Sequence, residues 1–254
     1  MLSPSETLPP HAVRATQTLS PPPVFRELAL LGCLGIALFL LASVLLVPSD
    51  KPAFHFGEEG AVTALSSILL AMSSVLALLV FYLGHKDLHL GTFLWLLLSA
   101  GFLLLSLDEQ LMFHERGGDA LKANGFGDAG VFRAWDDLIV ALYGVVALGV
   151  AAVFWREFMK CPLTGILFAV GFAFYLVHTI IDSIIPASVW WKDYPEEGAK
   201  LLCVFSMFLA VSAYVLALTE PLLGGDPNAR PGKPARRRNT NRAKGPKQGR
   251  RQDR

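Results

Sequence analysis

Six long runs of apolar residues constrain this sequence more than any other feature. They cover approximately residues 28–47, 61–83, 91–112, 138–155, 163–185 and 200–218 of a chain of 254 residues. Each run has roughly the 20-residue length that an α-helix needs to cross the hydrocarbon of a bilayer. Because 53% of the residues are hydrophobic and they gather in runs without alternation, we predict an all-α, polytopic integral membrane protein with six transmembrane helices in a bundle.

The two ends of the sequence differ in composition from this central part. Residues 1–25 are rich in Pro, Ser and Thr, which predicts a disordered N-terminal leader. Residues 26–220 form the predicted transmembrane domain, and residues 221–254 form a basic tail, broken by Pro and Gly, that is also predicted to be disordered. The three cysteines stand at unrelated spacings and predict neither a disulfide framework nor a zinc knuckle.

The distribution of positive charge predicts the orientation of the helices. Eleven of the 22 Lys and Arg residues lie between residues 230 and 254, and short basic segments beside a membrane span stay in the cytoplasm. Six crossings then place both termini on the cytoplasmic side of the cell inner (plasma) membrane. We expect the tail to contact anionic lipid headgroups. It lacks the aromatic residues that accompany basic patches in nucleic-acid sites, so no nucleic-acid partner is expected.

With this orientation, acidic residues gather at the outer ends of five helices. Some of them stand at predicted helix N-termini, where the helix dipole and the free N–H groups favour carboxylates and capping is a sufficient explanation. These residues are the pairs Glu58-Glu59, Asp136-Asp137 and Glu196-Glu197. Helical phase predicts that Glu59, Asp137 and Glu196 are the members that face the bundle interior.

Asp108, Glu109, Glu115 and Asp182 need another explanation, because they lie at or near helix C-termini, where the dipole opposes negative charge. Burial of a charge at the rim of the hydrocarbon must also be compensated. We therefore expect a cation, a proton or a base beside these acids. Arg116 is one candidate partner, for Glu109. Asp108 and Glu115, also seven residues apart, are expected to share one helix face and to lack such a partner.

Two histidines accompany these acids on the outer side. His178 and Asp182 have the i, i+4 spacing that places both side chains on one helix face, and His114 directly precedes Glu115. Imidazole and carboxylate groups without thiolates suit a divalent transition metal: zinc, or iron or manganese. The candidate ligands are Glu59, Asp108, His114, Asp137, His178, Asp182 and Glu196, with Glu109 or Glu115 as a general base outside the metal shell.

Two resemblances follow from these motifs. The segment Ser-Leu-Asp108-Glu109-x4-His114-Glu115 at the end of an apolar helix resembles a segment of uncharacterised bacterial multi-pass membrane proteins. This resemblance implies a bacterial inner membrane and no particular activity. The pair His178-x3-Asp182 is similar to the His-x3-His pair of the alkaline ceramidase-like transmembrane hydrolases, which have seven helices where this sequence predicts six.

The motifs support three functions. A metal-dependent hydrolase that acts on a lipid-like substrate is our main hypothesis, with the metal activating a water molecule at an outward-facing site. A cation or proton transporter would use the same acids as carriers, although the inner halves of the helices offer few ionisable residues to continue a path. A non-catalytic membrane partner or scaffold subunit would make its contacts through the basic tail and through the glycine-rich segment 115–135, which we expect to be a flexible lid or docking loop.

Overall fold

A computed structural model describes residues 18–46, 52–57, 59–84, 90–126, 134–186 and 188–220. Most of the predicted leader, the basic tail and Glu58 lie outside the described residues. The described residues form helices and contain no strand. In chain order the elements are α1 (Val24–Leu46), η2 (Pro52–Phe56), α2 (Ala61–Gly84), α3 (Leu90–Leu111), α4 (Phe113–Ala123), α5 (Trp135–Val153), α6 (Trp155–Phe158), α7 (Pro162–Ile184) and α8 (Asp193–Thr219).

Six of these helices are long and apolar enough to cross a membrane, which confirms the predicted fold class. They are α1, α2, α3, α5, α7 and α8. The last one begins seven residues before the predicted start at residue 200, at Asp193. Its first two turns are polar, with Pro195 in the first of them. The predicted span begins later because it was drawn from the run of apolar residues alone.

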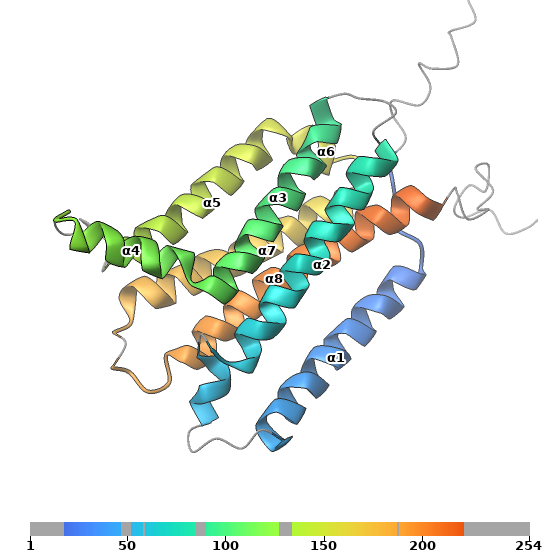
Figure 1. The fold of residues 1–254 in the computed structure, drawn as a ribbon. Coiled ribbons are helices and arrows are strands. Elements are labelled where there is room, and N and C mark those ends of the chain that lie inside the picture. Colours follow the sequence, from blue (N-terminus) through green and yellow to red (C-terminus); the bar gives the residue numbers. More distant parts are fainter. Residues whose placement is uncertain are drawn as a thin grey trace, which may run out of the picture.

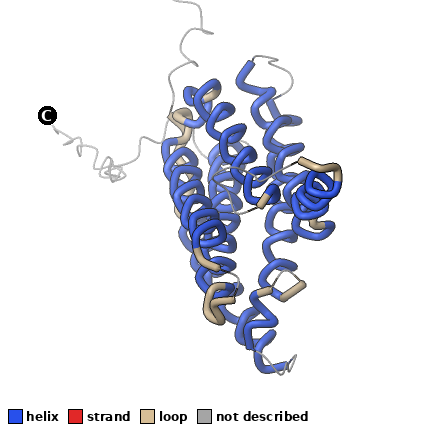
Figure 2. Tube along the Cα trace, turned by 90° about the vertical axis from the view of Figure 1, so that its left-hand side faces the viewer, coloured by secondary structure: helices blue, strands red, loops and turns tan. Residues whose placement is uncertain are grey.

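The six helices form a bundle with α8 near its centre (Figures 1 and 2). α8 packs against α7 on one side and against α2 on the other, and α2 packs against α3. α1 lies at the edge of the bundle in Figure 1 and is mostly exposed, with Gly32 in close approach to the Phe205 ring. α5 packs on α4 and α7, so it lies apart from the tightly packed group α2, α3 and α8.

Pairs of serines connect α2 to α3 inside the bundle. The Ser67 hydroxyl lies 3.1 Å from the Ser106 hydroxyl, and the Ser74 hydroxyl lies 3.2 Å from that of Ser99. Each pair also donates to backbone carbonyls of the facing helix, as in Ser67 Oγ to the Ser106 oxygen at 3.0 Å. The two pairs are seven residues apart on each antiparallel helix, so together they fix the register of α2 on α3. Small hydroxyl side chains allow this close approach.

Alanine substitutions test the contribution of these pairs. We expect Ser74→Ala to lower the free energy of unfolding by about 0.6–1.5 kcal/mol, the usual range for an interhelical hydrogen bond in a membrane protein. Ser43→Ala is the matched control, because the Ser43 hydroxyl donates to Phe39 O of its own helix. The measurement is reversible unfolding in mixed micelles. Equal effects of the two substitutions would contradict a role of the serine pairs in holding α2 to α3.

A break at Met112 separates α3 from α4. Met112 adopts the left-handed conformation, with φ 51° and ψ 48°, which is uncommon for a residue other than glycine. The expected alignment of Asp108 with Glu115 and of Glu109 with Arg116 is therefore wrong, because no continuous helix joins them. The expectation of a flexible loop at 115–135 is also wrong for its first part. Residues Phe113–Ala123 are the amphipathic helix α4, whose Gly118 lies against the backbone of Asp136.

A buried carboxylate fixes the opposite end of the bundle. Glu157 of α6 accepts a hydrogen bond from the Tyr214 hydroxyl at 3.0 Å and pairs with Lys160 at 2.7 Å. A Cβ at Gly91 would displace this carboxylate, so a glycine there leaves room for the Glu157 side chain. The ring of Trp95 lies on that of Tyr214. These contacts join α3, α6 and α8 at one end of the bundle. The predicted site residues lie at the other end.

Candidate functional site

A cavity of about 160 Å³ lies at the end of the bundle where α3 and α7 finish and α2, α5 and α8 begin. All five of these helices, and α4, contribute side chains to it. The cavity brings together seven of the nine predicted site residues: Asp108, Glu109, His114, Glu115, His178, Asp182 and Glu196. The acids and histidines therefore converge, although they come from segments up to 88 residues apart in the sequence.

The other two predicted residues, Glu59 and Asp137, do not line the cavity. Glu59 is exposed just before α2, and Thr63, one turn further along, takes its place in the cavity wall. Asp137 is buried, and its Oδ2 accepts a hydrogen bond from the Ala134 N–H at 3.2 Å. This contact caps the start of α5, so capping accounts for Asp137 without a ligand.

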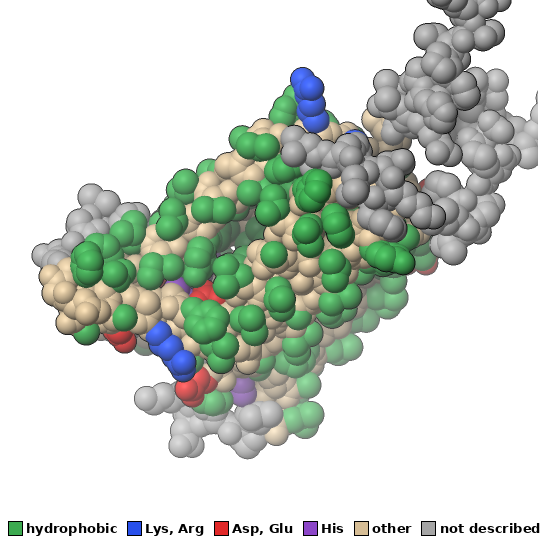
Figure 3. Space-filling view, turned by 45° about the horizontal axis from the view of Figure 1, so that its top comes forward, with side chains coloured by type: hydrophobic (Ala, Val, Ile, Leu, Met, Phe, Trp, Pro, Cys, Tyr) green, Lys and Arg blue, Asp and Glu red, His purple; other side chains and the backbone are tan. Residues whose placement is uncertain are grey.

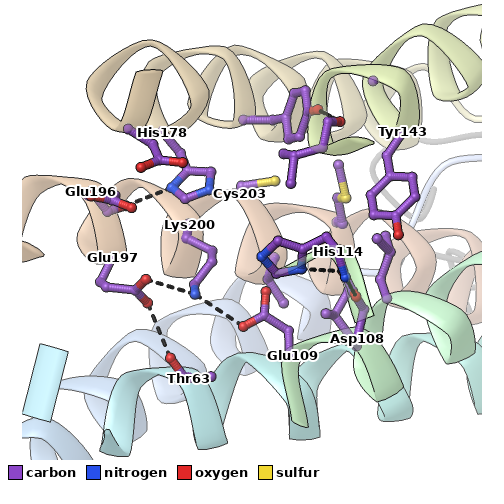
Figure 4. Close-up of a pocket in the computed structure, with 18 of the residues that line it drawn as sticks. Thr63, Asp108, Glu109, His114, Tyr143, His178, Glu196, Glu197, Lys200 and Cys203 are labelled. Carbon is purple, nitrogen blue, oxygen red and sulfur yellow. Dashed lines mark hydrogen bonds and ion pairs between the residues drawn. The ribbon is translucent and has the colours of Figure 1, made fainter. Parts of the chain in front are cut away.

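Lys200 lines the cavity, whereas the sequence suggested it only as a possible ion-pair partner of Glu196 and not as a site residue. Its Nζ lies 2.7 Å from Glu197 Oε1 and 3.1 Å from Glu109 Oε2, so it joins α8 to the end of α3 (Figure 4). The expected partner of Glu109 was Arg116, which is exposed on α4 instead. Glu197 also accepts a hydrogen bond from the Thr63 hydroxyl at 3.4 Å. The cation expected beside these acids is thus a lysine of the chain itself.

Helical phase assigned Glu197 to an outward face, and this prediction is wrong because α8 is covered on nearly all sides. Glu197 is only 4% exposed, and buried residues occur on every face of α8. A one-sided apolar stripe cannot show which face of such a central helix is inward. The short spacing between Glu197 and Lys200, three residues on a helix, was the available sign of this ion pair.

A second lysine neutralises the acids at the end of α7. Lys192, in the segment before α8, lies 2.8 Å from Asp182 Oδ1 and 3.2 Å from Glu196 Oε2. Burial alone would lower the pKa of Lys192, but the hydrogen bond and charge of Asp182, together with Glu196, raise this pKa above its ordinary value. Lys192 therefore stays charged and provides the positive partner that Asp182 needs at a helix C-terminus.

Asp108 has a different explanation, because it stands at two helix ends at once. It lies in the last turn of α3, but it also accepts the His114 N–H of the first turn of α4 on Oδ1 at 2.9 Å. The carboxylate thus caps α4, whose dipole favours it. Its Oδ2 lies 2.9 Å from His114 Nδ1. The six-residue spacing between Asp108 and His114 follows from the turn at Met112.

His178 lies across the cavity from His114 (Figure 4). Its Nδ1 is 3.3 Å from the backbone oxygen of Glu196, a donor contact to the first turn of α8. Both histidines thus use Nδ1 to contact an oxygen and keep Nε2 for other contacts. His114 Nε2 lies 3.9 Å from Glu115 Oε1. Two oriented imidazoles, a clamped lysine and several carboxylates make this end of the cavity suited to proton transfer and to charge stabilisation.

The rest of the cavity wall is apolar. It includes Leu70, Leu105, Ala147, Phe172 and Met207. Tyr175 donates a hydrogen bond to the backbone oxygen of Val140 and so ties α7 to α5 beside the cavity. A Cβ at Gly144 would collide with the Tyr175 ring, so this contact requires a glycine on α5. Carboxylate and histidine atoms are visible in a hollow of the surface between α5 and α3 (Figure 3).

Within the described part of the chain, no three His, Cys, Asp or Glu side chains form a ready group for a metal ion. Two lysines lie between these acids: Lys192 contacts Asp182 and Glu196, and Lys200 contacts Glu197 and Glu109. Each lysine carries one positive charge between two acids, so it compensates them only in part.

Comparison with known proteins gives one match. A family model described as "Domain of unknown function (DUF8692)" matches residues 28–217. No curated protein and no solved structure matches the chain. The matched range includes every residue of the cavity and four complete spans, together with all of α1 and α8 except the outermost residues of each. This result is consistent with a resemblance to uncharacterised proteins and adds nothing to the resemblance to the alkaline ceramidases.

Proposed function

Since this chain belongs to the DUF8692 family of unknown function, we propose its function from the geometry of the cavity. The protein is a membrane-embedded hydrolase that cleaves an ester or amide bond of a lipid-like substrate. The single observation that carries this proposal is the Asp108–His114 pair at 2.9 Å in a cavity with one polar end and one apolar wall. A carboxylate that holds Nδ1–H of an imidazole leaves Nε2 as a general base.

The groups at the polar end fit the steps of such a hydrolysis. His114 Nε2 takes a proton from a water molecule while the water oxygen bonds to the carbonyl carbon of the substrate. The carbonyl oxygen gains negative charge, which the Lys200 ammonium group stabilises. The bond to the leaving group then breaks, and the leaving group receives the proton from His114. Glu115, 3.9 Å from Nε2, stabilises the imidazolium that forms between these steps.

This assignment changes the expected roles of two acids. Glu109 and Glu115 were candidates for the general base. Glu109 is bound to Lys200, so its role is to hold the ammonium group in position. Glu115 adjoins the imidazole, so its role is electrostatic. His114 is the better base, because a carboxylate orients its ring and fixes its tautomer.

The orientation of the bundle is part of the proposal. We place both termini in the cytoplasm and the cavity on the outer side of the inner membrane. The support is the concentration of eleven Lys and Arg residues at 230–254, which begins eleven positions after the last span ends at Thr219. The substrate then reaches the site from the outer leaflet.

A divalent metal is a second candidate, favoured by the two histidines. Metal-bound histidines usually donate Nδ1–H to a carboxylate or a backbone carbonyl and bind the metal through Nε2. His114 contacts Asp108 in this way, and His178 contacts the Glu196 carbonyl. In this version Asp108 orients His114 and is not itself a ligand. A bound zinc, iron or manganese ion would supply the activated water in place of the His114 base.

The test is an assay of the purified full chain in proteoliposomes. Palmitoyl p-nitrophenyl ester, monopalmitoylglycerol and an N-palmitoyl amide serve as probes, and incorporation of oxygen from labelled water identifies hydrolysis. The double variant Asp108→Asn, His114→Gln is the blank. Hydrolysis by the wild type alone supports the proposal. Absence of product from all three probes, with or without added zinc, manganese or ferrous iron, would overturn it.

Elemental analysis of the same preparations distinguishes the two versions of the proposal. Stoichiometric metal that is lost in His178→Ala, together with loss of hydrolysis, assigns the water activation to the metal. Full hydrolysis in metal-free protein assigns it to His114. In that case we expect His178→Ala to retain most of the activity, because His178 has no direct part in the proton transfer.

A further inference from the structure

The cavity continues from its charged end towards the middle of the bundle. On three helices, lining residues lie seven positions apart: Thr63 and Leu70 on α2, Val140 and Ala147 on α5, and Lys200 and Met207 on α8. At 1.5 Å per residue, seven residues span about 10 Å along each helix. The charged groups stand at one end of this length and apolar side chains stand at the other. The cavity thus has the form of a short sleeve with a polar mouth.

One side of this sleeve is open. Ala147 lines the cavity, yet it is also exposed on α5, so the space is accessible from the surface at that residue. The hollow in Figure 3 lies between α5 and α3, in the part of the molecule formed by membrane spans. A molecule in the bilayer can therefore reach the cavity sideways.

The volume limits what fits. Enclosed water occupies about 10–15 Å³ of such a cavity per molecule, so 160 Å³ has room for a cluster of waters or for one alkyl chain. Side chains of five helices border the apolar end, and its length of about 10 Å takes roughly eight carbons of one extended chain. We therefore assign it an occupant with a single chain.

The charges limit the headgroup. Six carboxylates line the cavity and Lys200 is the one lysine in its wall, bound to two of them. The carboxylates are Asp108, Glu109, Glu115, Asp182, Glu196 and Glu197. Lys192, from outside the lining, contacts Asp182 and Glu196 of these six, so the two lysines together balance only part of the negative charge. The excess of negative charge at this end of the cavity would repel an anionic phosphate, whereas it would not repel a neutral or amine-bearing headgroup.

We propose that the cavity binds a single-chain amphipath with a neutral or cationic headgroup, which enters from the bilayer between α3 and α5. Its chain lies along Ala147 and Met207, and these two residues set the chain length that the cavity accepts. The inference rests on the proposed function for the position of the scissile bond, at the level of Lys200. The binding itself does not depend on hydrolysis. Bilayer hydrocarbon is as apolar as the sleeve, so selection for chain length comes from steric fit.

Photolabelling tests the binding directly. The full-length protein in nanodiscs is irradiated with an octanoyl monoglyceride that carries a diazirine at the chain end, and labelled peptides are identified by mass spectrometry. We expect labelling of residues 203–207 in the wild type, and about tenfold less in Ala147→Phe, whose ring overfills the sleeve. Val146→Phe is the matched control, because Val146 is the adjacent exposed residue on α5 and does not line the cavity.

Two further probes complete the design. A butanoyl monoglyceride with a diazirine at its chain end is expected to label Ala147→Phe as well as the wild type, because the shorter chain ends before residue 147. The diazirine analogue of octanoyl lysophosphatidic acid is expected to label the cavity about tenfold less than the octanoyl monoglyceride. Equal labelling of wild type and Ala147→Phe by the octanoyl monoglyceride, or equal labelling by the phosphate-bearing probe, would overturn the inference.

The result is distinguishable from that of the hydrolysis assay. Photolabelling of 203–207 that responds to Ala147→Phe and persists in His114→Gln, without any hydrolysis, supports the binding site and refutes the reaction. Hydrolysis of palmitoyl esters that is unaffected by Ala147→Phe supports the reaction and refutes the chain site. Met207→Ala provides an independent check, with an expected shift of preference towards longer chains.

Discussion

His114→Gln is expected to lower kcat for ester hydrolysis by about 10²–10⁴, the usual contribution of a general base. Glutamine keeps a similar length and can still contact Asp108, but it has no nitrogen that accepts a proton near neutral pH. KM should change little, because His114 acts on water and not on the chain of the substrate. Initial rates over a range of palmitoyl ester concentrations measure both constants.

Two aspartate variants serve as its controls. Asp108→Asn is expected to retain the cap on α4, since asparagine and aspartate are about equally good caps, while it loses the orientation of the imidazole and much of kcat. Asp119→Asn removes an exposed carboxylate of the same helix and should leave kcat unchanged. Wild-type kcat in His114→Gln would contradict the assignment of the base.

Lys200→Met should lower the free energy of unfolding by about 3–5 kcal/mol, because it leaves Glu109 and Glu197 buried next to each other without a cation. The methionine preserves the length of the side chain, so the loss reports charge and not volume. The measurement is the unfolding midpoint in mixed micelles at neutral pH. Acidification should restore part of the loss, because protonation removes the two uncompensated charges.

Charge-balanced variants show whether this loss arises from the carboxylates. The triple variant Glu109→Gln, Glu197→Gln, Lys200→Met is expected to recover most of the stability, since no charge remains unpaired. Lys122→Met, at an exposed position of α4, should be nearly neutral. If Lys200→Met and Lys122→Met gave the same unfolding midpoint, the buried ion pairs would have no part in stability.

The number and approximate limits of the spans could be predicted because they depend on composition alone. A run of about 20 apolar residues has few alternatives to a membrane helix, and all six predicted runs correspond to helices. The break at Met112 could not be predicted in this way. The residues around it have no Pro or Gly immediately adjacent, and α4 continues the helix after a single left-handed residue. Predictions that residues on the two sides of Met112 share one helix face were therefore wrong.

The convergence of the acids could also be predicted, but not their partners. The helix ends on one side of the membrane follow from counting crossings, which placed Asp108 and His178 near each other. Which lysine contacts which acid depends on the rotation of α8 between α2 and α7, and a helix that is buried on all sides gives no such information. Glu196 was consequently considered a partner of Lys200, whereas it pairs with Lys192. Asp108 lies in the last turn of α3 and also caps α4. This double role could not be predicted, because it depends on the break at Met112.

The serine pairs have a mechanical consequence for the two halves of the molecule. They lock α2 to α3 at two levels, and Lys200 attaches α3 to α8, so this half behaves as one rigid body. α5 has fewer such restraints: the Tyr175 bond to α7 and its contacts with α4. We therefore expect α5, together with α4, to move outward more readily than the other helices when a bulky guest enters the cavity.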